Sequence, residues 1–265
     1  MKPYAAGFIG AGNMGGALAQ AACRAVTPDR VILTCKTPEH TAAAAERLGC
    51  HTGTAETILK NSRFVFLGVK PQMLASVAAE LAPPLRGADC VLVSMLAGVT
   101  LDTLETCFPG KKLLRILPNT PCAVGGGMTF LCRGTLATEQ DVADFRALMA
   151  QSGRIDEIPE GQIDAACAVA GCGPAFAYLF AEALADGGVA CGLPRDKAIA
   201  YAAQMMLGSA EMILKTGVHP DQLKDNVCSP GGSTIAGVRA LESAAFRSAC
   251  MEAVIAAFDK TRSLG

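Results

Sequence analysis

The feature of this sequence that most constrains its fold is a glycine-rich turn between an apolar run and a helix pattern of small residues: Ala6-Gly7-Phe8-Ile9-Gly10-Ala11-Gly12-Asn13-Met14-Gly15-Gly16-Ala17-Leu18. Gly10 permits a tight turn, Gly12 lets bare backbone approach a pyrophosphate, and Gly15 lets the helix pack closely on the strand. Unpaired N–H groups at the helix N-terminus are then able to bind phosphates. The flanking patterns fit the same unit, with strands at residues 4–9 and 31–33 and a helix at residues 17–25. This context predicts a dinucleotide-binding fold rather than an ordinary strand-to-helix turn.

The residues after the second expected strand bear on the type of cofactor. A protein that binds NAD usually places an acidic residue there, which holds the ribose 2′-hydroxyl. This sequence has Thr34-Cys35-Lys36-Thr37-Pro38, with no acid. Lys36 and Thr37 are able to attract and hydrogen-bond a 2′-phosphate, so the sequence favours NADPH over NADH. The alternative is that Lys36 is a solvated loop lysine and that Thr37 only caps the helix beginning near Pro38.

Composition limits the remaining classes of protein. The chain has 265 residues, 51% of them hydrophobic, which is enough for one large or two ordinary domains. Its net charge of −1 and its lack of a basic block argue against a nucleic-acid partner. We expect no membrane span, because the most apolar stretch, residues 165–181, is interrupted by Gly171, Gly173 and Pro174. That stretch favours tightly packed helices instead.

The cysteines point to a reduced environment. The chain has 12 of them, no CxxC pair occurs, and their spacing to the 3 histidines indicates no metal site. Most lie in apolar or alanine-rich runs, where cysteine behaves as a small hydrophobic residue. We therefore expect a cytoplasmic protein without a bound metal.

Strand and helix patterns alternate through the first part of the chain, as is typical of a parallel sheet covered on both faces. The expected strands are residues 4–9, 31–34, 64–67, 90–95, 113–117 and 128–132, and the expected helices are residues 14–25, 39–48, 73–82, 101–107 and 139–151. From residue 163 onward the sequence shows only alanine-rich helices broken by glycine and proline. The expected fold class is thus α/β, a doubly wound sheet domain over residues 1–158 followed by an all-helical domain over residues 159–265. The small residues of those helices suit dimerisation or packing within one subunit equally well.

Ligands of an open α/β sheet bind beyond the carboxyl ends of its strands. Val69-Lys70-Pro71-Gln72 follows one expected strand, and Pro118-Asn119-Thr120-Pro121 follows another. Lys70 is placed to meet a ribose or pyrophosphate, and Asn119 and Thr120 are placed to face a nicotinamide. The alternative is that both are ordinary turns, since proline and asparagine are turn formers.

A further candidate site lies in the helical part, in the run Ser229-Pro230-Gly231-Gly232-Ser233-Thr234. Consecutive N–H groups of residues 231–234 at a helix start form a cradle suited to a small carboxylate. The alternative is a glycine-bearing connection between helices, capped by Ser233.

These motifs resemble the pyrroline-5-carboxylate reductase family nearly end to end. The similar segments are Gly7-Phe8-Ile9-Gly10-Ala11-Gly12-Asn13-Met14-Gly15, Val69-Lys70-Pro71, Ala97-Gly98-Val99-Thr100-Leu101, Pro118-Asn119-Thr120-Pro121, Gly173-Pro174-Ala175-Phe176 and Asp186-Gly187-Gly188. The longest signature runs from Leu223-Lys224-Asp225 through the Ser229 to Ile235 segment to Leu241-Glu242. The resemblance implies a Rossmann-type domain, a helical dimerisation domain that interlocks with a partner subunit in a dimer or larger oligomer, and reduction of 1-pyrroline-5-carboxylate to L-proline in the last step of proline biosynthesis.

The resemblance also implies roles for individual residues, with the substrate lying between the cofactor of one chain and the glycine turn of the other. The catalytic residue is Thr234, whose hydroxyl meets the ring nitrogen. The implied substrate-binding residues are Ser229, Gly231, Gly232, Ser233 and Thr234. NADPH, with NADH less preferred, is held by Ile9, Gly10, Ala11, Gly12, Asn13, Met14, Lys36, Thr37, Val69, Lys70, Pro71, Gln72 and Asn119.

The sequence departs from the family pattern at two places. Ala170 and Cys172 stand where the family has serines, so a hydroxyl role there is lost or weakened. Ala55 stands at the position where the family often has an asparagine near the cofactor ribose, so that contact is not expected here.

The implied hydride transfer to an imine requires mainly that donor and acceptor are positioned and the carboxylate is docked. This agrees with a sequence in which no histidine, cysteine or carboxylate pair suggests a general acid or base. One alternative, a 3-hydroxyacid dehydrogenase, requires a lysine where this chain has Ala177. Another, an NADPH-sensing or scaffold protein without turnover, is disfavoured by the intact glycine turn.

Overall fold

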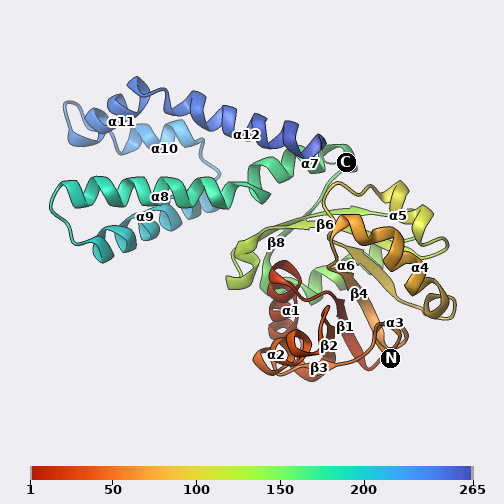
Figure 1. The fold of residues 1–265 in the computed structure, drawn as a ribbon. Coiled ribbons are helices and arrows are strands. Elements are labelled where there is room, and N and C mark those ends of the chain that lie inside the picture. The colour runs from red at the N-terminus through yellow and green to blue at the C-terminus, as the bar shows by residue number, and fades with distance from the viewer. Residues whose placement is uncertain (1, 264–265) are drawn as a thin grey trace. The chain divides into compact units, whose positions relative to one another are not determined.

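The computed structural model describes residues 2–263 (Figure 1). Contacts within the chain define two compact units: one comprises the chain through Cys172 and again from Phe258, and the other comprises Gly173–Ala257. The sequence placed its boundary between residues 158 and 159, and that division into domains stays a prediction.

The first unit is built on an eight-stranded sheet with the order β3-β2-β1-β4-β5-β6-β7-β8. The strands are β1 (Tyr4–Ile9), β2 (Val31–Thr34), β3 (His51–Thr52), β4 (Ser62–Leu67), β5 (Val91–Ser94), β6 (Lys112–Pro118), β7 (Gly127–Arg133) and β8 (Gly153–Glu157). The chain leaves β1 for β2 on one side and later adds β4 on the other side of β1. The order of strands therefore reverses between β1 and β4, which is where a doubly wound sheet binds its ligand.

The six expected strands are confirmed, but the sheet is not parallel throughout as the pattern predicted. Strands β6 and β7 run antiparallel, from Leu114 opposite Arg133 to Pro118 opposite Thr129. The connection between them is a short 3₁₀ segment, Thr120–Val124, which is too short for the crossover that parallel neighbours need. The sequence also missed β3, which has only two residues, and β8, an edge strand in which three of the five residues are charged.

Helices cover both faces of the sheet (Figure 1). One face carries α1 (Asn13–Ala25), α2 (Pro38–Leu48) and α6 (Glu139–Leu148), and the other carries α3 (Ala55–Asn61), α4 (Leu74–Leu85) and α5 (Leu101–Cys107). All of these except α3 were expected from the sequence.

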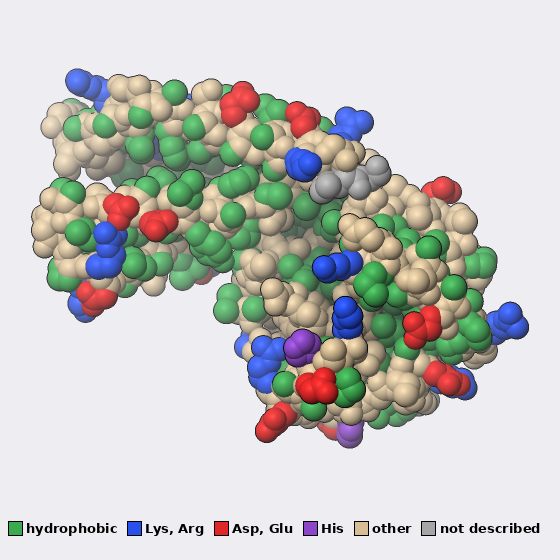
Figure 2. All heavy atoms as spheres, in the orientation of Figure 1, with side chains coloured by type: hydrophobic (Ala, Val, Ile, Leu, Met, Phe, Trp, Pro, Cys, Tyr) green, Lys and Arg blue, Asp and Glu red, His purple; other side chains and the backbone are tan. Residues whose placement is uncertain are grey.

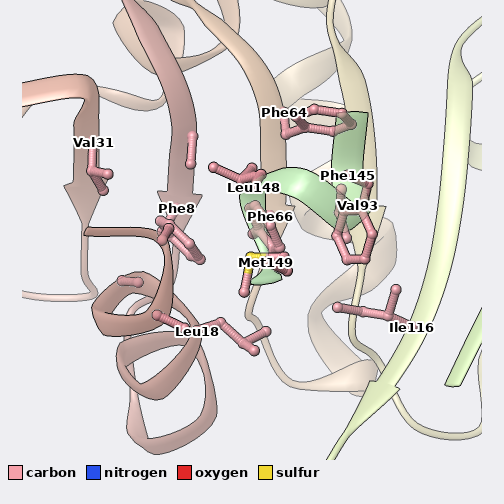
Figure 3. Close-up of a cluster of buried hydrophobic side chains, with 14 of the residues drawn as sticks. Phe8, Leu18, Val31, Phe64, Phe66, Val93, Ile116, Phe145, Leu148 and Met149 are labelled. Atoms are coloured by element: carbon pink, nitrogen blue, oxygen red, sulfur yellow. The ribbon is translucent and has the colours of Figure 1, made fainter. Parts of the chain in front are cut away.

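The core follows from the two-residue period of the strands. In β4, Phe64 and Phe66 join the cluster beneath α1 and α6, whereas Val65 and Leu67 join the cluster beneath α3 to α5. Both faces of the central strands are buried, so those strands are apolar at nearly every position. Figure 3 shows the first cluster, in which Phe8 of β1 stacks on Phe66 of β4 with ring centroids 4.4 Å apart.

The segment after β8 stays attached to the first unit. Glu160 Oε1 accepts hydrogen bonds from the buried Arg115 guanidinium at 2.5 Å and from Leu101 N–H at 2.7 Å. Ile163, the first residue of α7 (Ile163–Ala166), is 1% exposed and packs with Leu117 and Phe130. A π-helical turn, Cys167–Gly171, then leads into α8. These contacts explain why the compact unit extends past the end of the sheet.

The second unit contains α8 (Gly173–Ala190), α9 (Arg195–Thr216), α10 (Pro220–Asn226), α11 (Ser233–Ser243) and most of α12 (Phe246–Arg262). The all-helical expectation for this part is confirmed. Many of its large apolar side chains are exposed, among them Leu179 and Leu214 at 68% and 67%, and Figure 2 shows hydrophobic side chains spread over its surface.

Within one chain the apolar stretch before α9 packs against α9 along α8, but most of its surface stays exposed. Glycine and proline do not interrupt it, because the π-helical turn and the position of Pro174 in the first turn of α8 keep the backbone helical. By length and composition, Glu160–Ala190 qualifies as a candidate membrane span, with a mean hydropathy of 1.5 and 11% of its apolar window buried. An apolar helix that packs against another subunit meets the same criteria.

Candidate functional site

The loops that follow β1, β2 and β4 are joined at the carboxyl edge of the sheet. Gly10 N–H donates to Thr34 O at 2.9 Å, and Gly68 N–H donates to Ile9 O at 2.8 Å. These bonds bring the predicted cofactor residues of three separate segments to one edge, next to the point where the strand order reverses.

Two glycines allow this edge to close. Gly10 has a φ of +94°, which favours glycine, and a Cβ there would lie 2.5 Å from Gly68 O. A Cβ on Gly68 or on Gly15 would in turn collide with Gly10 O. Sequence reasoning recognised Gly10 and Gly15 but missed Gly68, although its place directly after a buried strand was a usable signal.

The start of α1 fits a phosphate. Gly12 occupies the N-cap, no side chain caps the helix, and its first turn contains no acidic residue. A Cβ built on Gly12 would have no atom within 4 Å, so the space beside this backbone is open. Free N–H groups, the positive end of the helix dipole and open space are what a pyrophosphate requires. The residues present therefore fit the dinucleotide that the sequence predicted.

After β2, the Thr37 hydroxyl caps α2 by accepting from His40 N–H at 3.3 Å, while its contact with a 2′-phosphate stays a prediction. Lys36 is exposed, and among the described residues no polar group pairs with it. Sequence reasoning overlooked Glu39 in the first turn of α2. Bonds from its own N–H and from the Thr37 hydroxyl lower the pKa of Glu39, so a carboxylate stands beside the cation and hydroxyl proposed for the 2′-phosphate.

The segment after β4 also lies at this edge. Lys70 is the N-cap of the 3₁₀ turn Pro71–Met73, and both Lys70 and Gln72 are exposed. Val69 is partly buried against the cluster beneath α3 to α5, which anchors the segment to the sheet.

The Asn119 side chain is committed to structural hydrogen bonds. Its Nδ2 donates to Ala170 O at 2.9 Å and its Oδ1 accepts from Met128 N–H at 2.9 Å. The residue is 8% exposed and ties the end of β6 to the π-helical turn and to β7. A cofactor contact by this side chain would have to use the second Nδ2 proton.

The glycine turn of the second unit connects α10 to α11. Gly231 has a φ of +68°, and Gly232 N–H donates to Ser229 O at 3.0 Å, which closes the turn. The N-cap of α11 is Gly232, without a side-chain cap, so the alternative in which Ser233 caps the helix is wrong. The first turn contains no acid, and Ser233 and Thr234 are exposed. All five predicted substrate residues thus lie in one turn. The Gly232 N–H is used within the turn, whereas the N–H groups of Gly231, Ser233 and Thr234 are open to an anion.

Comparisons with known proteins assign a family to each of two regions of the chain. Residues 160–264 match the family model described as pyrroline-5-carboxylate reductase dimerisation, and residues 5–98 match the one described as NADP oxidoreductase, coenzyme F420-dependent.

Two relatives that match over nearly their full length are named pyrroline-5-carboxylate reductase. Pyrroline-5-carboxylate reductase of Pisum sativum is 42% identical over 263 residues, covering 98% of this chain and 96% of the relative. That of Escherichia coli (strain K12) is 38% identical over 262 residues, covering 97% of each. The crystal structure of Plasmodium falciparum pyrroline carboxylate reductase with NADP bound superposes with a TM-score of 0.88 at 32% identity, covering 100% of this chain and 99% of that one.

Proposed function

The chain belongs to the pyrroline-5-carboxylate reductase family, and from that premise we propose that it reduces 1-pyrroline-5-carboxylate to L-proline with NADPH. The observation that carries the proposal is the uncapped, open turn at the start of α11, within a region that matches the family's dimerisation model. Its exposed N–H groups suit the carboxylate of this substrate.

The cofactor is assigned to the carboxyl edge of the sheet in the first unit. When bound there, NADPH supplies the hydride that reduces the carbon–nitrogen double bond. The backbone of residues 10–14 holds the pyrophosphate at the uncapped start of α1. Lys36 and Thr37 face the 2′-phosphate, and residues 69–72 border the ribose and pyrophosphate. The relative with NADP bound and the match to an NADP oxidoreductase model support this assignment.

The substrate is assigned to residues 229–234. The N–H groups of Gly231, Ser233 and Thr234, which have no partner within the turn, fix the carboxylate, and the Thr234 hydroxyl hydrogen-bonds the ring nitrogen. This orients the imine carbon, and the nitrogen gains its proton through that hydroxyl or from water. Binding and orientation account for the rate, because a protonated imine is already electrophilic.

Self-association completes the proposed enzyme. The match to a dimerisation model and the exposed apolar side chains of α8 and α9 support a dimer or larger oligomer. We infer that the substrate lies between the cofactor of one subunit and the glycine turn of another. The twelve free thiols support a reduced, cytoplasmic location, and the near-zero charge supports the absence of a nucleic-acid partner. We also propose that the protein does not associate with a membrane.

The test is oxidation of NADPH and NADH, followed at 340 nm, with racemic 1-pyrroline-5-carboxylate and with cyclic imines of other ring size. The expected result is rapid turnover with the five-membered ring and a preference for NADPH. Binding of NADPH without oxidation in any mixture would contradict the proposed reaction while leaving the cofactor site intact.

A further inference from the structure

The first unit has a cavity of about 500 Å³ that is distinct from the proposed cofactor site. It is lined by Lys2, just before β1, by Arg30, just before β2, and by Arg63 and Phe64, at the start of β4. Because β1, β2 and β4 are parallel, these residues lie at their amino ends. The glycine loops lie at the opposite ends, and six residues of strand separate the two edges by about 20 Å.

Two cations at this cavity lack partners. Lys2 Nζ and Arg30 Nε are both buried without a hydrogen bond, and among the described residues neither side chain forms an ion pair. The Arg30 guanidinium makes one bond, from Nη2 to Lys2 O at 3.4 Å. Buried charged nitrogens without acceptors are costly, and native proteins normally satisfy them.

The acidic residues nearby do not neutralise these two cations. Asp144 lines the cavity but pairs with Arg63 at 3.0 Å, and Asp141 pairs with Arg63 at 2.7 Å and with Lys112 at 2.9 Å. Burial lowers the pKa of Lys2. The charges of Cys90 and Asp89 act in the opposite direction, but neither residue forms an ion pair with Lys2. Two buried donors beside the cavity therefore remain uncompensated.

The rest of the lining is apolar. Phe64 and Leu148, both labelled in Figure 3, contribute to it, together with small residues of β1 and of the end of α1. A wall of this kind favours a ligand with an apolar body, and the two cations favour an oxyanion at one end of it.

We propose that this cavity binds a small organic anion, with a carboxylate or phosphate group between Lys2 and Arg30 and an apolar body against Phe64 and Leu148. The site is separate from the proposed active site, so its occupant and NADPH bind at the same time. It would be a second ligand site in the nucleotide-binding unit.

The test uses isothermal titration of the full-length protein with benzoate and with phenyl phosphate, which distinguish a carboxylate from a phosphate ester. Benzyl alcohol tests the need for charge, and inorganic phosphate tests the need for an apolar body. We expect at least one aromatic anion to bind at least tenfold more tightly than benzyl alcohol and inorganic phosphate, with saturating NADPH present or absent.

Substitutions of the lining residues test whether the anion binds in this cavity. Lys2→Met combined with Arg30→Gln should weaken binding at least tenfold, whereas Arg30→Lys, which keeps the charge, should weaken it less. Lys60→Gln removes an exposed lysine of α3 that pairs with Glu56 and serves as the matched control. If the double variant fails to fold, as judged by circular dichroism, Lys2→Met alone takes its place.

Three results would overturn the proposal: no binding of either aromatic anion to the wild type, undiminished binding to the Lys2 and Arg30 variants, or displacement of the anion by NADPH. Each is independent of whether the protein reduces 1-pyrroline-5-carboxylate.

Discussion

At the scale of single residues, Thr234 is the side chain on which the proposed chemistry depends most. It is exposed in the first turn of α11, and its neighbours supply backbone N–H groups rather than side chains. Thr234→Ala should lower kcat by at least tenfold and leave the NADPH dissociation constant unchanged, because the hydroxyl orients the substrate only. Steady-state kinetics and fluorescence titration of NADPH measure the two quantities. Thr234→Ser keeps the hydroxyl and is the control, and unchanged turnover of the alanine variant would remove Thr234 from the mechanism.

The charges around the start of α2 should set the cofactor preference. Lys36→Glu places a carboxylate where a 2′-phosphate is proposed, and it should lower the ratio of kcat/KM for NADPH over NADH by at least tenfold. Glu39→Gln removes the ionised carboxylate beside Thr37 and should raise the same ratio. Lys60→Glu, on α3, changes the charge equally at a remote position and should have no effect. A ratio that responds to none of these changes would place the 2′-phosphate elsewhere.

Asp141 makes the stability of the first unit depend on pH. Its carboxylate is 1% exposed, and burial alone would raise its pKa, but bonds from Thr138 and Lys112 outweigh burial and lower the pKa to about 2. Because the folded pKa lies below the unfolded value, the stabilisation is complete above about pH 4 and is lost as the pH falls toward 2. The shift corresponds to about 2 kcal/mol.

Urea unfolding of the wild type and of Asp141→Asn measures this contribution. The difference in unfolding free energy between them should be largest near pH 6 and should shrink as the pH falls from 4 toward 2. A difference that stays constant over this window would contradict the assigned pKa.

At the scale of secondary-structure elements, two glycines at the start of α1 serve different purposes. Gly15 is required for folding, whereas Gly12 is required for binding of the cofactor. A Cβ on Gly15 would collide with Gly10 O, so Gly15→Ala should destabilise the protein by on the order of 1–3 kcal/mol. A Cβ on Gly12 meets nothing within 4 Å, so Gly12→Ala should keep the melting temperature but weaken NADPH binding at least tenfold.

Gly16→Ala is the matched control for both changes. Its Cβ would meet the flexible end of Arg47 at 3.3 Å, and alanine favours helix, so stability and NADPH affinity should both be preserved. Thermal melts and fluorescence titration of the three variants test this division. Normal NADPH affinity in Gly12→Ala would show that the phosphates do not approach that backbone.

At the scale of the whole molecule, the exposed apolar side chains of the second unit require a partner surface. Exposure of such residues to water is energetically unfavourable, and the matching family model describes a dimerisation region. The wild type should sediment as a dimer or larger oligomer. Leu179→Glu combined with Leu214→Glu, on α8 and α9, should shift it toward the monomer and abolish turnover, because the proposed site needs two subunits.

The control for this prediction is Leu136→Glu, which replaces an exposed leucine of the first unit and should leave both properties unchanged. Sedimentation velocity and the NADPH assay give the two readouts. A fully active monomer would refute the shared site.

Local chemistry explains what the sequence by itself determined. The turn from β1 into α1 and the helices after residue 163 depend on glycine conformation, apolar period and helix propensity within a few residues. Those patterns predicted the six principal strands, the all-helical second part and the glycine loop at the carboxyl edge of the sheet. They missed β3 because two residues carry no period, and they missed the antiparallel direction of β7 because direction depends on the connection and not on the strand.

Only the tertiary structure decided which distant residues meet. Gly68 must be glycine because Gly10 packs against it, Asn119 is occupied because Ala170 and Met128 reach it, and Asp141 is ionised because Lys112 and Thr138 surround it. The unpaired nitrogens of Lys2 and Arg30 likewise come together only once β1 and β2, which these residues precede, have paired. A local pattern records what each residue favours, whereas close packing between segments far apart in sequence fixes the partners, and the partners set charge, space and binding.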